Sequence, residues 1–262
     1  MATYLDRIVA AHRAAAAADH RPLAPLLEAA LRQPPARPFA DAVRGGEGVA
    51  IIAEVKRRSP SRGELAPRLV AAEAARRYEA GGAVALSVLT DGEFFGGSPA
   101  DLAGARAACD LPVLRKDFTV DRRDVLDARL MGADAVLVIV AALDDAELRG
   151  LVALAGEVGL DALVEVHDEV EVARAVAAGA TLVGVNQRDL LTFAVDPERA
   201  LRLAPLLPPE TVRVAESGIA GPDDVRRLGD AGYDAVLVGE WLVTSGDPEA
   251  AVRSLRCGVV RA

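Results

Sequence analysis

Eight short, almost continuously apolar runs recur along this chain of 262 residues and constrain its fold more than any other feature. They are rich in Val, Ile, Leu and Ala, and they begin about 20 to 33 residues apart. A strand that is buried on both faces needs such continuous hydrophobicity, whereas a half-exposed strand alternates apolar and polar residues. The pattern therefore predicts buried parallel strands over 50–56, 83–90, 112–118, 134–140, 161–167, 181–187, 212–217 and 234–239.

Helix signals occupy the segments between the runs. Ser98 and Pro99 fit an N-cap and a first helical position, and aspartates fit the N-caps of four later helices. Glycines fit the helix ends, because glycine adopts the left-handed backbone of a C-cap without steric cost. The predicted N-caps are Asp121, Asp144, Asp168 and Asp223, and the predicted helix-ending glycines are Gly81, Gly132, Gly159, Gly179 and Gly232.

A weak internal repeat indicates how these units are arranged. The run GADAVLV at 132–138 recurs as GYDAVLV at 232–238, 100 residues later. At about 25 residues a unit, this distance is half of an eight-unit barrel. An open doubly wound sheet is the alternative, but it usually carries a glycine-rich nucleotide loop near its start. We predict an α/β protein, a (β/α)8 TIM barrel over 49–262, with a helical N-terminal extension (1–48) packing on it in one domain.

Rare polar residue types gather at the predicted strand ends. Of the 30 basic side chains 28 are arginine, so the two lysines, Lys56 and Lys116, mark positions where an ammonium is needed. An ammonium can transfer a proton near neutral pH, whereas a guanidinium stays protonated. Both lysines and the one asparagine, Asn186, end predicted strands, where barrel active sites form. Their companions at these ends are Glu54, Ser87, Glu165, Arg188, Glu216 and Ser217. A layer of structural ion pairs could explain one such pair, but not charged groups from five strands.

Glycines after the last two runs indicate a phosphate site. Gly218 follows the seventh run, and Gly239 and Glu240 follow the eighth. The loops after the last two strands of such barrels commonly bind phosphate, since glycine lets backbone N–H groups approach an anion. With Lys56 and Arg188 nearby, these turns predict a phosphorylated small-molecule substrate.

Composition narrows the class of partner and the compartment. The formal net charge is −9 and no long basic cluster occurs, which argues against nucleic acid and membrane surfaces as partners. No apolar run approaches the roughly 20 residues of a membrane span, and the first 20 residues carry charges where a signal peptide would be apolar. Cys109 and Cys257 fit buried thiols in a reducing compartment. We expect a cytoplasmic protein, most simply a monomer, with a weak homo-oligomer as the alternative.

Other reactive residue types are sparse. No HExxH, CxxC or P-loop motif occurs, so we predict neither a metal nor a cofactor. His12 and His20 lie in the leading helical segment, where we expect them to be solvated. His167 follows Glu165 closely but has no Ser or Cys nucleophile motif beside it, so a catalytic triad is not expected.

The motifs that carry these polar residues resemble those of the indole-3-glycerol phosphate synthase family. The match runs in order from about residue 50 to residue 240, and the combination is specific to that family. The motifs are IAEVKRRSPSRG at 52–63, LT at 89–90 followed by FGGS at 95–98, LRKDF at 114–118, LVEVH at 163–167, GVNQRDL at 184–190 and AESGI at 215–219. The family's helical N-terminal extension would suit the first 45 residues. Departures are small, and Trp241 stands after Glu240 where a small residue is frequent.

The resemblance implies roles for individual residues of this chain. The catalytic lysine falls on Lys116 and the catalytic glutamate on Glu165, with Glu54, Lys56, Asn186 and Ser217 supporting them. The implied substrate contacts are Ser59, Phe95, Leu137, Arg188, Glu216, Gly218, Gly239 and Glu240.

The resemblance also implies the reaction. The substrate would be 1-(o-carboxyphenylamino)-1-deoxyribulose 5-phosphate, closed to indole-3-glycerol phosphate with loss of CO2 and water in tryptophan biosynthesis. Lys116 would protonate the ketone oxygen, and Glu165 would act as general acid or base in the dehydration. Two alternatives stay open: an aldolase-type barrel that uses a lysine Schiff base, and a non-catalytic phosphate-binding paralogue.

Overall fold

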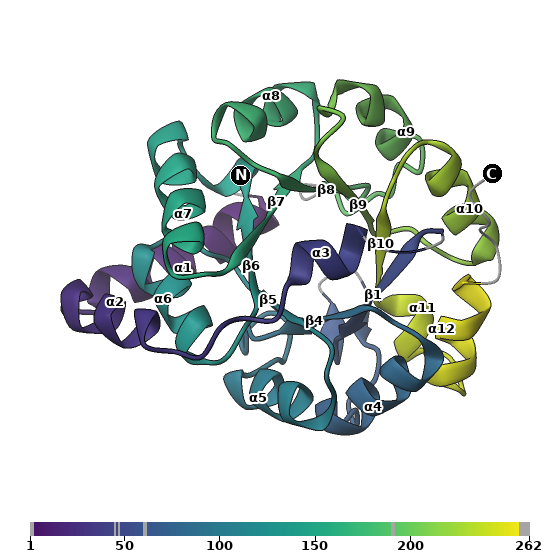
Figure 1. The fold of residues 1–262 in the computed structure, drawn as a ribbon, viewed down its shortest axis with the longest axis horizontal. Helices are drawn as coiled ribbons and strands as arrows, with labels where there is room; N and C mark the ends of the chain where they lie inside the picture. Colours follow the sequence, from purple (N-terminus) through teal and green to yellow (C-terminus); the bar gives the residue numbers. More distant parts are fainter. Residues whose placement is uncertain (1–2, 45, 47, 60–61, 190–191, 257–262) are drawn as a thin grey trace.

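All eight predicted runs form parallel strands that close into one barrel (Figure 1). The computed structural model describes residues 3–44, 46, 48–59, 62–189 and 192–256. Each strand pairs with the next along the chain, and the last pairs with the first, with Ala235 opposite Ala50. Closure confirms the predicted (β/α)8 barrel and excludes an open doubly wound sheet. The barrel strands are β1 (Ala50–Val55), β4 (Ala85–Leu89), β5 (Val113–Lys116), β6 (Ala135–Ile139), β7 (Asp161–Val166), β8 (Leu182–Asn186), β9 (Val212–Glu216) and β10 (Ala235–Val238).

Helices alternate with these strands and form the outer ring of the barrel (Figure 1). A parallel barrel needs this cover, because its strands are apolar on both faces. The ring consists of α4 (Ala71–Gly81), α5 (Pro99–Ala108), α6 (Arg122–Leu130), α7 (Asp145–Glu157), α8 (Glu169–Ala177), α9 (Arg199–Leu203), α10 (Pro222–Asp230) and α12 (Pro248–Arg256). Short additions are the hairpin β2 (Arg58–Ser59) and β3 (Gly63–Glu64), the 3-10 turns η1 (Val140–Ala142) and η2 (Ala204–Leu206), and α11 (Glu240–Val243).

Most predicted helix caps are present, and two are wrong. The side chains of Ser98, Asp121, Asp144 and Asp168 accept N-cap hydrogen bonds. Asp223 is instead the second residue of α10, because Pro222 sets the helix start and Asp224 accepts from the Ala220 N–H. Gly81 is the last residue of α4, and Gly82, with φ 92°, supplies the left-handed cap.

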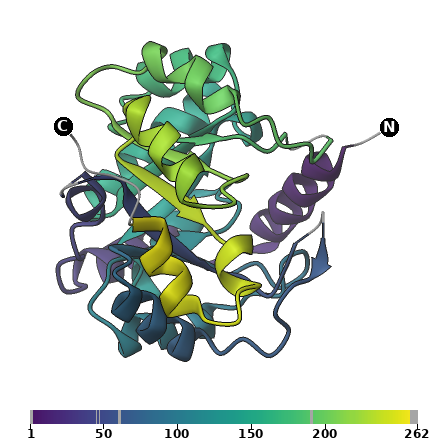
Figure 2. The ribbon, with the colours of Figure 1, turned by 90° about the vertical axis from the view of Figure 1, so that its right-hand side faces the viewer.

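The leading segment reaches both ends of the barrel (Figures 1 and 2). It comprises α1 (Tyr4–Ala18), α2 (Leu23–Leu31) and α3 (Phe39–Arg44). α3 covers the end where the strands begin: the Ala40 N–H donates to Asp161 Oδ2 at 2.8 Å, and the Arg37 N–H donates to Asp134 Oδ1 at 2.7 Å. α1 lies at the opposite end, where the strands finish. The division at residue 48 stays a proposal.

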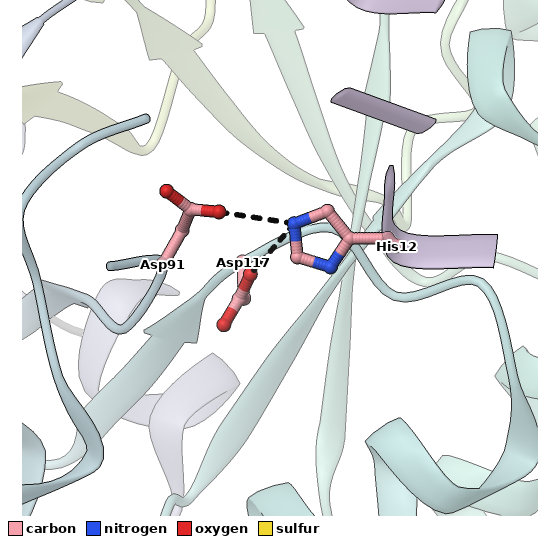
Figure 3. A group of neighbouring side chains, drawn as sticks. All are labelled: His12, Asp91 and Asp117. Atoms are coloured by element: carbon pink, nitrogen blue, oxygen red, sulfur yellow. Dashed lines mark hydrogen bonds and ion pairs between the residues drawn. The ribbon is translucent and has the colours of Figure 1, made fainter. Parts of the chain in front are cut away.

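His12 attaches α1 to the barrel, contrary to the prediction that it is solvated (Figure 3). Its Nε2 lies 3.0 Å from Asp91 Oδ2 and 3.8 Å from Asp117 Oδ1, just after the ends of β4 and β5. Burial opposes protonation of this ring, but the hydrogen bond to Asp91 and the charge of Asp117 outweigh it and raise the pKa of His12. His20, by contrast, is exposed as expected.

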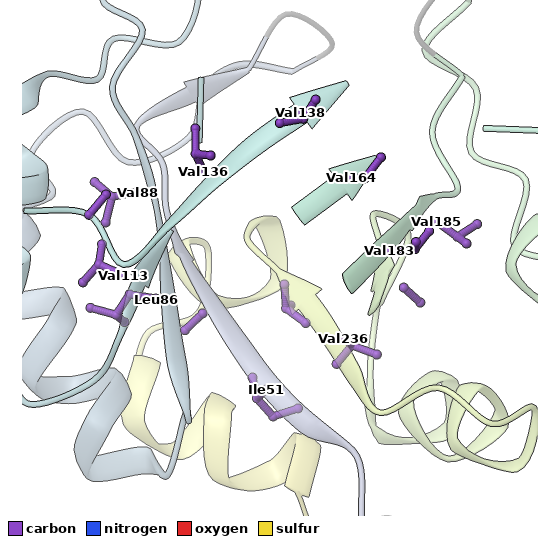
Figure 4. Close-up of a cluster of buried hydrophobic side chains, with 14 of the residues drawn as sticks. Ile51, Leu86, Val88, Val113, Val136, Val138, Val164, Val183, Val185 and Val236 are labelled. Atoms are coloured by element: carbon purple, nitrogen blue, oxygen red, sulfur yellow. The ribbon is translucent and has the colours of Figure 1, made fainter. Parts of the chain in front are cut away.

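The core forms two layers that are separated by the barrel wall. Alternate strand residues point outward and pack under the helix ring (Figure 4); among them are Ile51, Val88, Val136 and Val236. The other set fills the barrel interior, where Ile52, Leu114 and Leu163 join Phe39 from α3. Cys109 is buried in the outer layer as a free thiol, as predicted, and Cys257 lies outside the described residues.

Removing the Phe39 ring should lower the stability of the barrel. Phe39 is fully buried at the end closed by α3, so Phe39→Ala is expected to lower the free energy of unfolding by about 3–5 kcal/mol in urea titrations. Val170→Ala on α8 is the control, because this side chain is 68% exposed and should change stability by less than about 0.5 kcal/mol. A loss below about 1 kcal/mol for Phe39→Ala would contradict the sealing role of α3.

Attachment of α1 should weaken as pH rises. The pKa of His12 is raised in the folded state, so its stabilisation is complete below the unfolded value of about 6.5 and is lost as pH rises through the higher folded value. His12→Gln should therefore speed hydrogen exchange in α1 most below pH 6, by the equivalent of about 1 kcal/mol. The matched control is His20→Gln. An effect of His12→Gln that does not change with pH would contradict the ion pair.

Candidate active site

The strand ends and α1 enclose a cavity of about 470 Å³. Its walls come from the carboxyl ends of the barrel strands, from the loops that follow them, and from Tyr4, Leu5 and Ile8 of α1. Ser87, also expected at a strand end, does not line it. Every residue proposed for the site does line it: Glu54, Lys56, Ser59, Phe95, Lys116, Leu137, Glu165, Asn186, Arg188, Glu216, Ser217, Gly218, Gly239 and Glu240.

Lys116 lies at the centre of the polar part of this cavity. Its Nζ is 3.3 Å from Glu165 Oε2 and forms a close ion pair with Glu216 Oε2. Burial of an ammonium disfavours its charge, but Glu216, Glu165 and Glu54 outweigh that effect and raise the pKa of Lys116. The side chain is therefore an ammonium, held at the end of β5 by carboxylates from β7 and β9.

Glu165 and Glu216 face the same ammonium in different environments. Burial raises the pKa of Glu216, and together with the charges of Glu165 and Glu54 it outweighs the opposing effect of Lys116. For Glu165, burial is outweighed by Lys116, His167 and Asn186, so its pKa is lowered. Asn186 Nδ2 donates to Glu165 Oε1 at 3.1 Å. The pair thus combines an ionised carboxylate with one that takes up a proton more readily, an arrangement suited to proton transfer.

Lys56 forms a second ion pair beside the first. Its Nζ lies 2.6 Å from Glu54 Oε1, and both residues belong to the end of β1. Gly239 makes room for this pair, because a Cβ there would collide with the Glu54 carboxylate and lie 3.1 Å from Lys56 Nζ. Both lysines therefore project into the cavity that Glu165 lines.

The backbone after β9 and arginines from the loops after β1 and β8 line the side of the cavity where we expected an anion to bind. Ser217 and Gly218 have φ of 66° and 73°, so two successive residues adopt the left-handed conformation. Successive N–H groups in such turns make anion-binding concavities. The Glu240 carboxylate lies 2.9 Å from Arg62 Nη2 and 4.0 Å from Arg188 Nη2, so both guanidinium groups are paired with a carboxylate.

Apolar side chains also line the cavity, and some of them were not predicted from the sequence. Phe95 and Phe118 stand with ring centroids 6.1 Å apart, and Leu137 joins them in the lining. Ile8 comes from α1, which lies far from these residues in sequence, so no local motif signals its role. Trp241 borders the cavity after Glu240 and is 38% exposed.

Within the described part of the chain, one group has donors close enough to hold a metal ion: His12, Asp91 and Asp117. Their existing bonds already account for their positions. Asp91 Oδ1 accepts from the Phe94 and Phe95 N–H groups, and Asp117 Oδ2 accepts from Arg115 Nη2. The imidazole supplies the remaining donor, so we assign ion pairs here.

Over the same described residues, none of the helices has the length and apolar character needed to span a bilayer.

Solved structures similar to this chain share its barrel. A 3-hexulose-6-phosphate synthase aligns with a TM-score of 0.66 at 18% identity, covering 80% of this chain and 100% of that one. A thiamine phosphate pyrophosphorylase from Pyrococcus furiosus aligns with a TM-score of 0.61 at 17% identity, covering 83% and 96%. At such identities the likeness concerns the fold alone.

Sequence relatives are much closer. A Nocardioides sp. protein named indole-3-glycerol phosphate synthase is 61% identical over 208 residues, 79% of this chain and 80% of that protein. A Streptomyces coelicolor protein named indole-3-glycerol phosphate synthase 2 is 53% identical over 232 residues, 88% and 90% of the two chains. The family model described as indole-3-glycerol phosphate synthase matches residues 5–255. The chain therefore belongs to the indole-3-glycerol phosphate synthase family.

Proposed function

We propose that this enzyme closes 1-(o-carboxyphenylamino)-1-deoxyribulose 5-phosphate to indole-3-glycerol phosphate, releasing CO2 and water. It is a carbon–carbon lyase of tryptophan biosynthesis. The observation that carries the residue assignments is the buried Lys116 ammonium between Glu165 and Glu216, with Lys56 in the same cavity.

Ring closure needs an acid at the ketone oxygen. The ring carbon that bears the carboxylate attacks the ketone carbon, and the oxygen becomes a hydroxyl as it receives a proton. We assign this proton to Lys116, whose pKa is raised, so the ammonium is present throughout the neutral range. Lys56 is the second cation, placed to hold the substrate carboxylate before CO2 leaves.

Dehydration needs an acid for the departing hydroxyl and a base for a proton on the new ring. We assign the base to Glu165, since its lowered pKa keeps it ionised. A lysine ammonium beside it assists departure of water. Asn186 fixes the Glu165 carboxylate, and Ser217 lies at the strand end facing the same space.

We place the two ends of the substrate against different parts of the cavity lining. Phe95 and Leu137 provide an apolar surface for the anilino ring. Arg188 and the turns at Gly218 and Gly239 suit the phosphate. These steps are proton transfers and loss of CO2 by the chain's own residues, so we propose activity without metal or cofactor, in a cytoplasmic monomer.

The aldolase-type alternative is disfavoured by the state of Lys116. A Schiff base forms from a neutral amine, whereas carboxylates raise the pKa of this lysine. A non-catalytic paralogue would not need acid, base and orienting groups in one cavity.

Formation of indole fluorescence from the carboxyphenylamino substrate, with EDTA present, tests the proposal directly. Turnover without metal and no adduct after borohydride treatment are expected. Binding without turnover would favour the paralogue, and a trapped lysine adduct would favour the aldolase chemistry.

Lys116→Arg should lose catalysis while retaining substrate binding. Arginine keeps the positive charge but cannot transfer a proton near neutral pH, so kcat is expected to fall by at least about 10²-fold. Quenching of Trp241, the one tryptophan of the chain, reports binding of a non-reacting product analogue. Turnover close to that of the unmodified enzyme would refute the assignment of Lys116 as the acid.

Gly184→Ala should disturb catalysis through Glu216. A Cβ at Gly184 on β8 would collide with Glu216 Oε1 and lie 3.3 Å from Leu163 Cδ1. The carboxylate must then move away from Lys116, and we expect kcat to fall about 10- to 100-fold. Gly150→Ala, in α7, has no atom within 4 Å of its new Cβ and is the control; it should retain kcat and gain up to about 1 kcal/mol of stability. Equal kcat in both variants would show that Glu216 need not stay in place.

A further inference from the structure

His167 lies between two carboxylates rather than alone. Its side chain is 11% exposed, at the junction of β7 and α8. Nδ1 is 3.0 Å from Glu171 Oε2, and Nε2 is 3.3 Å from Glu165 Oε1. The ring does not line the cavity, so its contact with the site passes through Glu165.

Glu171 is itself fixed by the start of α8. Its carboxylate accepts the His167 backbone N–H at 2.8 Å, and its own N–H donates to the N-cap Asp168 at 2.8 Å. The carboxylate therefore has little freedom to leave Nδ1. This local arrangement directs the Nε2 side of the ring toward Glu165.

The two contacts determine the protonation state of the ring. A neutral imidazole has one N–H and one lone pair, so one carboxylate would face a lone pair. The imidazolium offers an N–H to both. Burial opposes this charge, but Glu165 and Glu171 outweigh burial and raise the pKa of His167 to about 9.

Glu165 consequently has a cation on each side. Lys116 Nζ lies 3.3 Å from Oε2, and His167 lies 3.3 Å from Oε1, which also accepts from Asn186. Among the described residues, His167 Nε2 is buried and has no acceptor in hydrogen-bond geometry. The contact is thus an ion pair in which the positive ring attracts Glu165 Oε1.

We propose that His167, held as an imidazolium by Glu171, is a positioning residue that orients Glu165 and maintains it as the carboxylate base. The proposal rests on the function assigned to Glu165 above. The charged groups that face the ring are Glu165 from β7 and Glu171 from α8, with Lys116 from β5 beyond Glu165. Loss of the imidazolium proton at high pH would leave a lone pair against one carboxylate and remove one of the two cations that hold Glu165.

NMR titration of the imidazole C–H signals tests the pairing without requiring activity. The chain has three histidines, so His12→Gln and His20→Gln assign the His167 signal. We expect His167 to titrate near pH 9, and both Glu171→Gln and Glu165→Gln to lower its pKa by at least one unit, since each removes one facing charge. Titration of His167 at or below pH 6.5, or no change in Glu165→Gln, would overturn the proposal.

The pH profile of kcat distinguishes positioning from a purely structural role. His167→Gln should lower kcat about 10-fold with KM changed less than about threefold. Glu171→Gln should move the alkaline decline of kcat to lower pH, in step with the NMR titration. His167→Asn, which like His167→Gln keeps an amide donor without the charge, should lose kcat to a similar extent.

Two results of these assays would overturn the positioning role. One is an alkaline decline that stays in place in Glu171→Gln, and the other is a full kcat in His167→Gln. Absence of indole formation by the unmodified enzyme would instead contradict the proposed reaction, while the NMR titration would still decide whether His167 pairs with Glu165.

Discussion

The buried ion pairs of Lys116 are the constraint on which the rest of the site depends. Leaving an ammonium buried without its partners costs about 3–5 kcal/mol, so the carboxylates of β7 and β9 must reach the end of β5 together. They do so because the closed barrel brings three strands that are not sequence neighbours to one interior space. Gly184 contributes by leaving the volume that the Glu216 carboxylate occupies. The fold and the proposed chemistry are therefore linked through one set of contacts.

The barrel and much of the site could be predicted because their signals are local. A strand buried on both faces reads as an apolar run, and the polar residue that ends the run is visible beside it. The scarcity of two residue types added a second signal. The chain is rich in arginine and has only two lysines and one asparagine, so Lys56, Lys116 and Asn186 stood out as candidate site residues. The helix caps were harder to predict. Pro222 is the first residue of α10, so Asp223 lies inside the helix and is not its N-cap. The left-handed residue that ends α4 is one position beyond Gly81.

Contacts between segments that are far apart in the sequence could not be predicted from such local signals. His12 and Asp91 are 79 residues apart, and no periodicity joins α1 to the loop after β4. His167 is an intermediate case. Its i,i+4 spacing to Glu171 is a helix-start signal that could have indicated a partner. Absence of a nucleophile motif argued against a triad, but it said nothing about a role through Glu165.

The position of α3 determines from which end of the barrel substrate can enter and products can leave. Phe39 and Val43 pack with the interior side chains at the end of the barrel opposite the cavity. Among the described residues, these side chains close that end of the barrel. Substrate, CO2, water and product must then share the opening beside α1. Because Tyr4, Leu5 and Ile8 of α1 line the cavity, any molecule that enters or leaves it passes close to this helix.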